Sequence, residues 1–144
     1  MKRVLVVDDD PEVRGLLTSI LVRRNMTVDQ ATDGREALDL LGTNKYEVVL
    51  LDLVMPNIDG IHVLDAIHAS PVQPVVLVVT GADRSQLGQL DSGRIHGIVR
   101  KPFDSDELGD LVVQCAEIRG RGTFEAMAIS TMVVTIPWLS LFVN

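Results

Sequence analysis

The sequence has little of several features that would indicate common classes of protein. It contains one cysteine, Cys115, which excludes an intramolecular disulfide, and the absence of any CxxC pair favours a reducing compartment. Basic residues are the minority, with 13 Lys and Arg against 20 Asp and Glu and a net charge of -7. Nucleic-acid binding normally needs a clustered basic face. We therefore expect a cytoplasmic location and no direct nucleic-acid partner.

The start of the chain also lacks a long apolar run. Residues 4–7 are apolar, but they follow Met1, Lys2 and Arg3 and lead directly into acidic residues. An export signal has an apolar core of about 7–15 residues. We therefore expect that the body of the protein is not exported.

What the sequence does contain is a series of short, valine-rich apolar runs. Runs of four or five residues are typical of strands that are buried on both faces, as they are in parallel sheets. Together with a less apolar segment at 26–30, these runs predict five strands. They cover residues 4–7, 26–30, 48–51, 75–79 and 97–100.

Segments with helical spacing alternate with these strands. Residues 11–25 have an apolar stripe that includes Leu16, with Asp10 as the N-cap and Pro11 at the first helical position. Asp33 and Glu36 resemble a capping box that opens a second helix. We expect Gly42 to end that helix, and three more to occupy about 61–69, 83–94 and 104–119.

The alternation of strands and helices predicts an α/β fold. Because crossovers between parallel strands are right-handed, the expected architecture is a doubly wound, five-stranded parallel sheet with helices on both faces. The pattern ends near residue 119, and 144 residues leave almost no room for a second folded domain. We therefore predict one domain at 1–119 and an apolar tail at 120–144.

Polar side chains follow four of the predicted strands. Asp8 and Asp9, Asp52, Thr80 and Lys101 stand at or just after the strand ends. The carboxyl ends of parallel strands share one edge of a sheet, so these side chains should form one site. Carboxylates suit a hard ion such as Mg²⁺, and without a cation their mutual repulsion should raise at least one carboxylate pKa. The set indicates a divalent cation and a phosphoryl group.

These residues and their neighbours resemble the receiver domain of bacterial two-component response regulators. The resemblance covers about residues 2–119, and its motifs are distinctive, correctly ordered and correctly spaced. It implies a flavodoxin-like sheet of order 2-1-3-4-5. The motifs are Val-Val-Asp8-Asp9 followed by Arg14, Leu-Leu-Asp52-Leu-Val-Met-Pro-Asn-Ile-Asp59-Gly60, Val-Val-Thr80-Gly81 and Lys101-Pro102-Phe103.

The resemblance implies a role for each acidic residue. Asp52 would be the nucleophile that accepts a phosphoryl group from a phosphohistidine of a sensor histidine kinase or a histidine phosphotransfer protein. Asp9 and Asp52 would bind Mg²⁺ together with the backbone carbonyl of Val54, and Asp8 would act largely through water. The expected function is that of a single-domain response regulator with a downstream protein target, and not that of an enzyme acting on a separate substrate.

The resemblance also implies how the phosphoryl group is held and detected. Lys101 would pair with one phosphoryl oxygen and Thr80 would hydrogen-bond another. The peptide bond before Pro102 is a cis candidate. Phosphorylation would draw Thr80 inward and change the surface formed by the fourth helix, fifth strand and fifth helix. Ile98 occupies the position where an aromatic switch residue is common in the family, so we expect little change in its exposure.

Several alternatives remain open. Val54 and Ala82 lie two residues beyond Asp52 and Thr80, at positions where family members often carry polar side chains that orient an attacking water molecule. Because neither residue can do this, one hypothesis is that the phosphoryl group is hydrolysed slowly. The other is that Val54 is simply a packing residue. A magnesium-dependent phosphatase with an aspartyl nucleophile is a second class of function, although Val54 stands where such enzymes usually have an acid. A non-phosphorylated interaction module is a third. We interpret His62, His68 and His96 as solvated side chains.

The family does not explain the tail. Residues 126–143 contain no charge and follow a basic flank at 119–121. A membrane helix needs about 17–25 apolar residues, so the segment is just long enough to anchor the domain to a membrane. Pro137 and several Ser and Thr residues argue against a membrane helix. Packing on its own domain or on a partner in a homodimer, and a tail without a functional role, are the alternatives.

Overall fold

A computed structural model of the chain describes residues 1–53, 55, 60–81 and 94–119. Nearly all of the helix predicted at 83–94, and the whole tail, lie outside these residues. The elements are β1 (Arg3–Val7), α1 (Pro11–Val22), β2 (Thr27–Ala31), α2 (Gly34–Thr43), β3 (Val48–Leu51), α3 (Gly60–Ala69), β4 (Val75–Thr80), β5 (Gly97–Arg100) and α5 (Ser105–Arg119).

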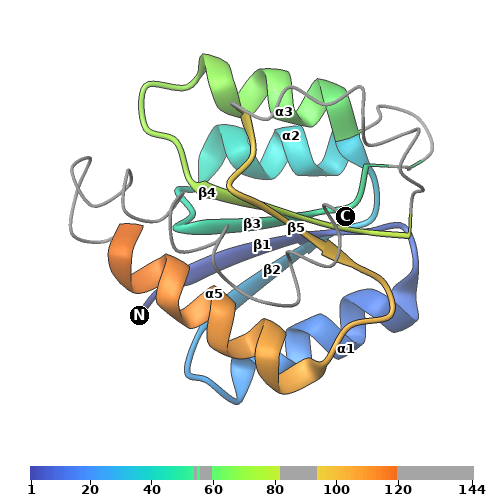
Figure 1. Cartoon of the computed structure of the whole chain (residues 1–144). Helices are drawn as coiled ribbons and strands as arrows, with labels where there is room; N and C mark the ends of the chain where they lie inside the picture. The colour runs from blue at the N-terminus through green and yellow to red at the C-terminus, as the bar shows by residue number, and fades with distance from the viewer. Residues whose placement is uncertain (54, 56–59, 82–93, 120–144) are drawn as a thin grey trace.

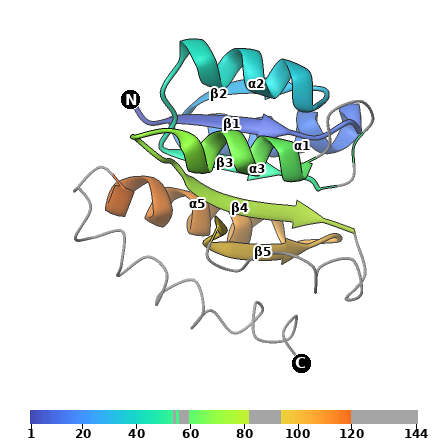
Figure 2. The same ribbon diagram turned by 90° about the horizontal axis from the view of Figure 1, so that it is seen from above.

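The five strands form one parallel sheet of order β2-β1-β3-β4-β5, which confirms the predicted fold class and topology. Helices α1 and α5 cover one face, and α2 and α3 cover the other (Figures 1 and 2). Side chains alternate along β1, so that Val4 and Val6 join the cluster under α1 and α5, whereas Leu5 and Val7 join the cluster under α2 and α3. Burial on both faces explains the continuous apolar runs.

The helix ends agree with most of the predicted signals. The Asp10 carboxylate accepts a hydrogen bond from the Glu12 amide at 2.9 Å, as the N-cap of α1. At α2 the Asp33 carboxylate accepts from the Glu36 amide, also at 2.9 Å. Such caps satisfy amide groups that have no partner within the helix.

Three details of the predicted helices were wrong. Helix α1 ends at Val22 and not near residue 25, because Asn25 takes a positive φ of 61° that breaks the helical conformation. Leu16, expected in the core stripe of this helix, is 46% exposed. Helix α2 ends at Thr43 and not at Gly42. Asn44 is its C-cap, and the Asn44 side-chain amide donates to the Leu40 carbonyl at 3.2 Å.

Candidate functional site

The ends of four strands meet at one edge of the sheet, as the sequence predicted. Asp8, Asp52 and Lys101 directly follow β1, β3 and β5, and Thr80 is the last residue of β4. Backbone hydrogen bonds fix the positions of these residues along the strands. The Asp52 amide donates to the Val7 carbonyl at 2.9 Å, and the Lys101 amide donates to the Thr80 carbonyl at 3.0 Å. Neighbouring strands thus place the side chains at adjacent positions.

The side chains at this edge are joined by direct hydrogen bonds. The Thr80 hydroxyl donates to Oδ1 of Asp52 at 3.0 Å. The Lys101 ammonium group donates to Oδ2 of Asp52 at 3.2 Å and to Oδ2 of Asp8 at 2.6 Å. Among the described residues, the polar or charged residues classed as buried are Asp8, Asp52 and Thr80. Burying polar groups is costly unless they are paired, so their concentration here indicates a site rather than part of the core.

Three carboxylates of this edge are close enough to share a cation. Asp8, Asp9 and Asp52 each offer an oxygen, and these oxygens all lie within 4.8 Å of one another. Asp8 and Asp52 are buried and Asp9 is exposed, so the cluster opens to solvent on the side of Asp9. Oxygen donors that leave positions for water suit Mg²⁺. Val54, which we expected to add a backbone carbonyl, lies outside the described residues.

Burial and charge pairing have opposite effects on the two ends of the Asp8–Lys101 ion pair. Burial raises the pKa of Asp8 above its ordinary value, although the hydrogen bond from Lys101 works in the other direction. Burial alone would lower the pKa of Lys101, but Asp8 and Asp52 together raise it. The predicted raised carboxylate pKa is therefore present at Asp8, with burial as its main cause and the charge of Asp52 as a minor one.

The backbone around Asp8 is held by the start of α1. The Asp10 amide donates to Oδ1 of Asp8 at 2.9 Å, and the Arg14 guanidinium donates to the Asp8 carbonyl at 2.8 Å. Asp8 therefore has both a fixed backbone and a fixed carboxylate. At the opposite side of the site, the bond between Lys101 and Pro102 is cis, as the resemblance implied.

Gly60, named from the sequence only as the last residue of the Asp52 motif, is also part of this site. It is the first residue of α3, and its amide donates to the Leu53 carbonyl at 3.2 Å. A Cβ added to Gly60 would lie 2.7 Å from Cα of Leu53 and 2.8 Å from the carbonyl oxygen of Asp52. Only glycine allows α3 to approach the Asp52 backbone this closely. The Asp-Gly pair before a helix was the available signal.

Other residues named from the sequence lie at or outside this site. Ile98 is partly buried and packs against the cluster under α2 and α3. His62 and His68 are exposed, as expected. The interpretation of His96 as solvated was wrong: the side chain is partly buried, and its Nδ1 accepts a hydrogen bond from the Val76 amide at 3.0 Å. Ala82 lies outside the described residues.

Comparison with known proteins adds a family to this geometry. Residues 4–113 match the family model described as the response regulator receiver domain. The chain is 37% identical over 108 residues to the transcriptional regulatory protein TcrA of Mycobacterium tuberculosis, covering 74% of this chain and 42% of that protein. It is 38% identical over 108 residues to the response regulator MprA of Mycolicibacterium vanbaalenii, with coverages of 74% and 46%. The chain thus spans less than half the length of these relatives.

A solved structure supports the same relationship. The response regulator protein TrrA of Thermotoga maritima, determined in complex with Mg²⁺ and BeF, is 34% identical and superposes with a TM-score of 0.72, covering 80% of this chain and 99% of that one. In the described part of the chain, no helix combines the length and hydrophobicity that crossing a bilayer requires.

Proposed function

This chain belongs to the response regulator receiver domain family of two-component signalling, and we propose that Asp52 is its phosphoryl acceptor. One observation carries the proposal. The buried Asp52 carboxylate has Thr80 at one oxygen and Lys101 at the other, each within hydrogen-bond distance. The hydroxyl and the ammonium group are therefore already positioned for the negative charge that a phosphoryl group would bring.

The transfer is a nucleophilic displacement at phosphorus. A carboxylate oxygen of Asp52 forms a bond to the phosphorus atom of a phosphohistidine, the bond from phosphorus to the imidazole nitrogen breaks, and that nitrogen takes up a proton. The product is an acyl phosphate on Asp52. Thr80 would then donate to one phosphoryl oxygen and Lys101 to another, so both side chains exchange a carboxylate contact for a phosphoryl contact.

Mg²⁺ fits the carboxylate cluster. Asp9 and Asp52 would hold the ion directly, with the Val54 carbonyl as a third ligand and Asp8 acting through water. Support comes from the oxygen-only donor set and from the relative TrrA, which was determined with Mg²⁺ and BeF. When bound, the ion supplies positive charge that neutralises the phosphoryl oxygens. The residues of the chain orient the acceptor and exclude water from its buried side.

The proposed switch starts at Thr80. Its hydroxyl contacts Asp52 in this structure, so a phosphoryl group on Asp52 would give it a new and more strongly charged acceptor. Ile98 has no hydroxyl to bury or expose, and it already packs against the cluster under α2 and α3. We therefore expect its solvent exposure to change little on phosphorylation. Methyl NMR with a solvent paramagnetic probe measures this, and a large change at Ile98 would contradict the proposal.

Incubation with a small phosphodonor such as acetyl phosphate tests the phosphoryl acceptor. With Mg²⁺ present, intact-mass spectrometry should show one added phosphoryl group, and a chelator should greatly slow its appearance. The Asp52→Asn variant keeps the shape of the side chain but should gain none. If the unaltered protein gains no phosphoryl mass, or if the Asn variant gains it as rapidly, Asp52 is not the acceptor.

The partners and output follow from the same proposal. The phosphodonor would be a sensor histidine kinase or a histidine phosphotransfer protein in the cytoplasm. The receiver unit itself would comprise residues 1–119. Signalling through a protein target remains our proposal, but TcrA is named a transcriptional regulatory protein, so transcriptional control is a second output to test. The prediction that nucleic acid is not a partner is therefore restricted to the acidic receiver unit itself. Family membership favours signalling over the phosphatase alternative.

A further inference from the structure

A groove separates the C-terminal parts of α2 and α3. Its volume is about 550 Å³, which falls within the roughly 300–1,000 Å³ of typical binding pockets. Tyr46 and Pro74 line it just before β3 and β4 begin, so it lies at the amino ends of the strands. The carboxylate site is at the opposite ends. The groove is therefore a separate feature of the domain.

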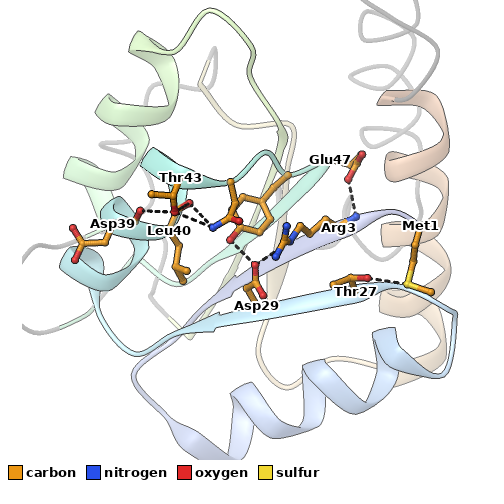
Figure 3. A network of polar contacts seen from close by, with 10 residues as sticks. Met1, Arg3, Thr27, Asp29, Asp39, Leu40, Thr43 and Glu47 are labelled. Atoms are coloured by element: carbon orange, nitrogen blue, oxygen red, sulfur yellow. Dashed lines mark hydrogen bonds and ion pairs between the residues drawn. The ribbon is translucent and has the colours of Figure 1, made fainter.

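A polar network holds in place the wall that Tyr46 contributes to this groove. Figure 3 shows Arg3, Asp29 and Glu47 of this network. Tyr46 is only 6% exposed, and its hydroxyl donates to Oδ2 of Asp29 at 2.7 Å. Nε of Arg3 donates to the same Asp29 oxygen at 3.1 Å, and the Arg3 amide donates to Glu47 at 2.7 Å. The network joins β1, β2 and the start of β3, so the groove does not depend on a mobile side chain for its shape.

The rim of the groove is apolar and open to solvent along α3 and the residues that follow it, whereas Thr43 and Lys45 are exposed on the side of α2. Val72 is 51% exposed, and Ala66 and Pro71 are also exposed. Single exposed apolar residues are ordinary on protein surfaces, but these three border one hollow. Among the described residues that line the groove, Lys45 alone carries a charge. The chemistry of the groove therefore suits an uncharged, apolar occupant.

The chain leaves its last described helix beside this groove. Arg119, the final residue of α5, donates from Nε to the Gln73 carbonyl at 2.6 Å. Gln73 lies between Val72 and Pro74, which both line the groove. Residues 120–125 connect this point to the uncharged segment 126–143. Six extended residues span at most about 20 Å, enough to reach the groove from its own rim.

We infer that the apolar segment 126–143 of this chain docks in the groove between α2 and α3. The groove, its exposed apolar rim and the exit of the chain beside it give that segment a place to bury its side chains against its own domain. Docking would also cover the Val72 rim and tie the end of α5 to the opposite face of the sheet.

Trp138 is the only tryptophan of the sequence and lies within this segment, so its fluorescence reports docking directly. We expect blue-shifted emission and weak acrylamide quenching in the full-length chain. Val72→Glu, which places a charge on the rim, should red-shift the emission and raise the quenching constant at least about twofold, because an undocked indole is exposed to water. Ala66→Glu, at a second exposed position of the lining on α3, should have the same effect.

Val22→Glu is the matched control. Val22 is 54% exposed and lies on α1, on the opposite face of the sheet. The substitution should therefore leave the emission and the quenching of Trp138 unchanged. Circular dichroism establishes that each variant folds. Solvent-exposed Trp138 emission in the unaltered chain, or equal quenching in all three variants, would overturn the inference. So would protection that appears only at high protein concentration, which indicates a second copy, or only with phosphatidylglycerol vesicles, which indicates a membrane.

Discussion

Replacement of Gly60 by alanine tests how tightly α3 is packed against Asp52, the proposed phosphoryl acceptor. The added Cβ would meet backbone atoms, namely Cα of Leu53 at 2.7 Å and the Asp52 carbonyl oxygen at 2.8 Å. Carbon atoms in favourable contact are about 3.5–4.0 Å apart, so the two backbone segments must separate by about 0.8 Å. Neither contact can be relieved by rotating a side chain.

Two energies set the size of the effect on stability. Overpacking of this kind costs about 1–3 kcal/mol. Alanine in place of glycine recovers up to about 1 kcal/mol within a helix, and less at the first helical position. We therefore expect Gly60→Ala to lower the free energy of unfolding by about 1–2 kcal/mol.

The same displacement should affect the chemistry more than the stability. A shift of about 1 Å in a reacting group can cost about 100-fold in rate. We expect the rate of phosphorylation of Asp52 by a small phosphodonor to fall about 10- to 100-fold, measured under conditions where the variant is fully folded. Urea unfolding and phosphorylation kinetics followed by mass spectrometry give the two quantities.

Gly15→Ala provides the control. Gly15 is exposed in α1, and a Cβ added there meets nothing within 4 Å, so this variant should be more stable by up to about 1 kcal/mol and phosphorylated at the normal rate. If Gly60→Ala behaves like Gly15→Ala in both measurements, the close approach of α3 to Asp52 is not required and our account of Gly60 is wrong.

Two further predictions concern pH and phosphoryl lifetime. Burial, with a smaller contribution from Arg119, lowers the pKa of His96, so the unfolded chain binds more protons below pH about 6.5 and the free energy of unfolding should fall as the pH falls below that value. Because one histidine takes up at most one proton, the slope cannot exceed about 1.4 kcal/mol per pH unit, and His96→Asn, which keeps an acceptor for the Val76 amide, should remove this contribution in urea unfolding at a series of pH values; an unchanged slope would refute this. Val54 and Ala82 cannot orient an attacking water, so the acyl phosphate should decay over many minutes in radiolabel measurements, and decay within seconds would contradict the hypothesis.

The position of the site could be predicted because it depends on strand ends. In a parallel sheet buried on both faces, an apolar run such as 48–51 ends where the strand leaves the buried sheet and polar residues begin. The carboxyl ends of all the strands lie at the same edge of the sheet. Asp52 and Thr80 were therefore predictable from the apolar runs that precede them. The contact between them required no knowledge of how any helix packs.

Features that depend on packing between distant elements could not be predicted from local patterns. Leu16 has the spacing of a core residue, yet it is 46% exposed, because the cluster under α1 and α5 takes Leu17, Ile20 and Leu21 of α1 instead. His96 gains its buried hydrogen bond only because β4 lies beside the start of β5. The need for glycine at position 60 becomes visible only when α3 is placed against Leu53. In each case the determining neighbour is remote in the sequence or belongs to another element.

The ion pair between Asp8 and Lys101 also has a consequence for the order of folding. Its two residues are 93 positions apart, and they directly follow β1 and β5, the first and the last of the strands that the structure describes. Contacts between such distant segments carry a large loop-closure cost and typically form late. A partly folded chain that lacks a docked β5 would have Asp52 but no ammonium group beside it. Under the proposed function, the positive charge that Lys101 places beside Asp52 is therefore available only after β5 has docked on the sheet.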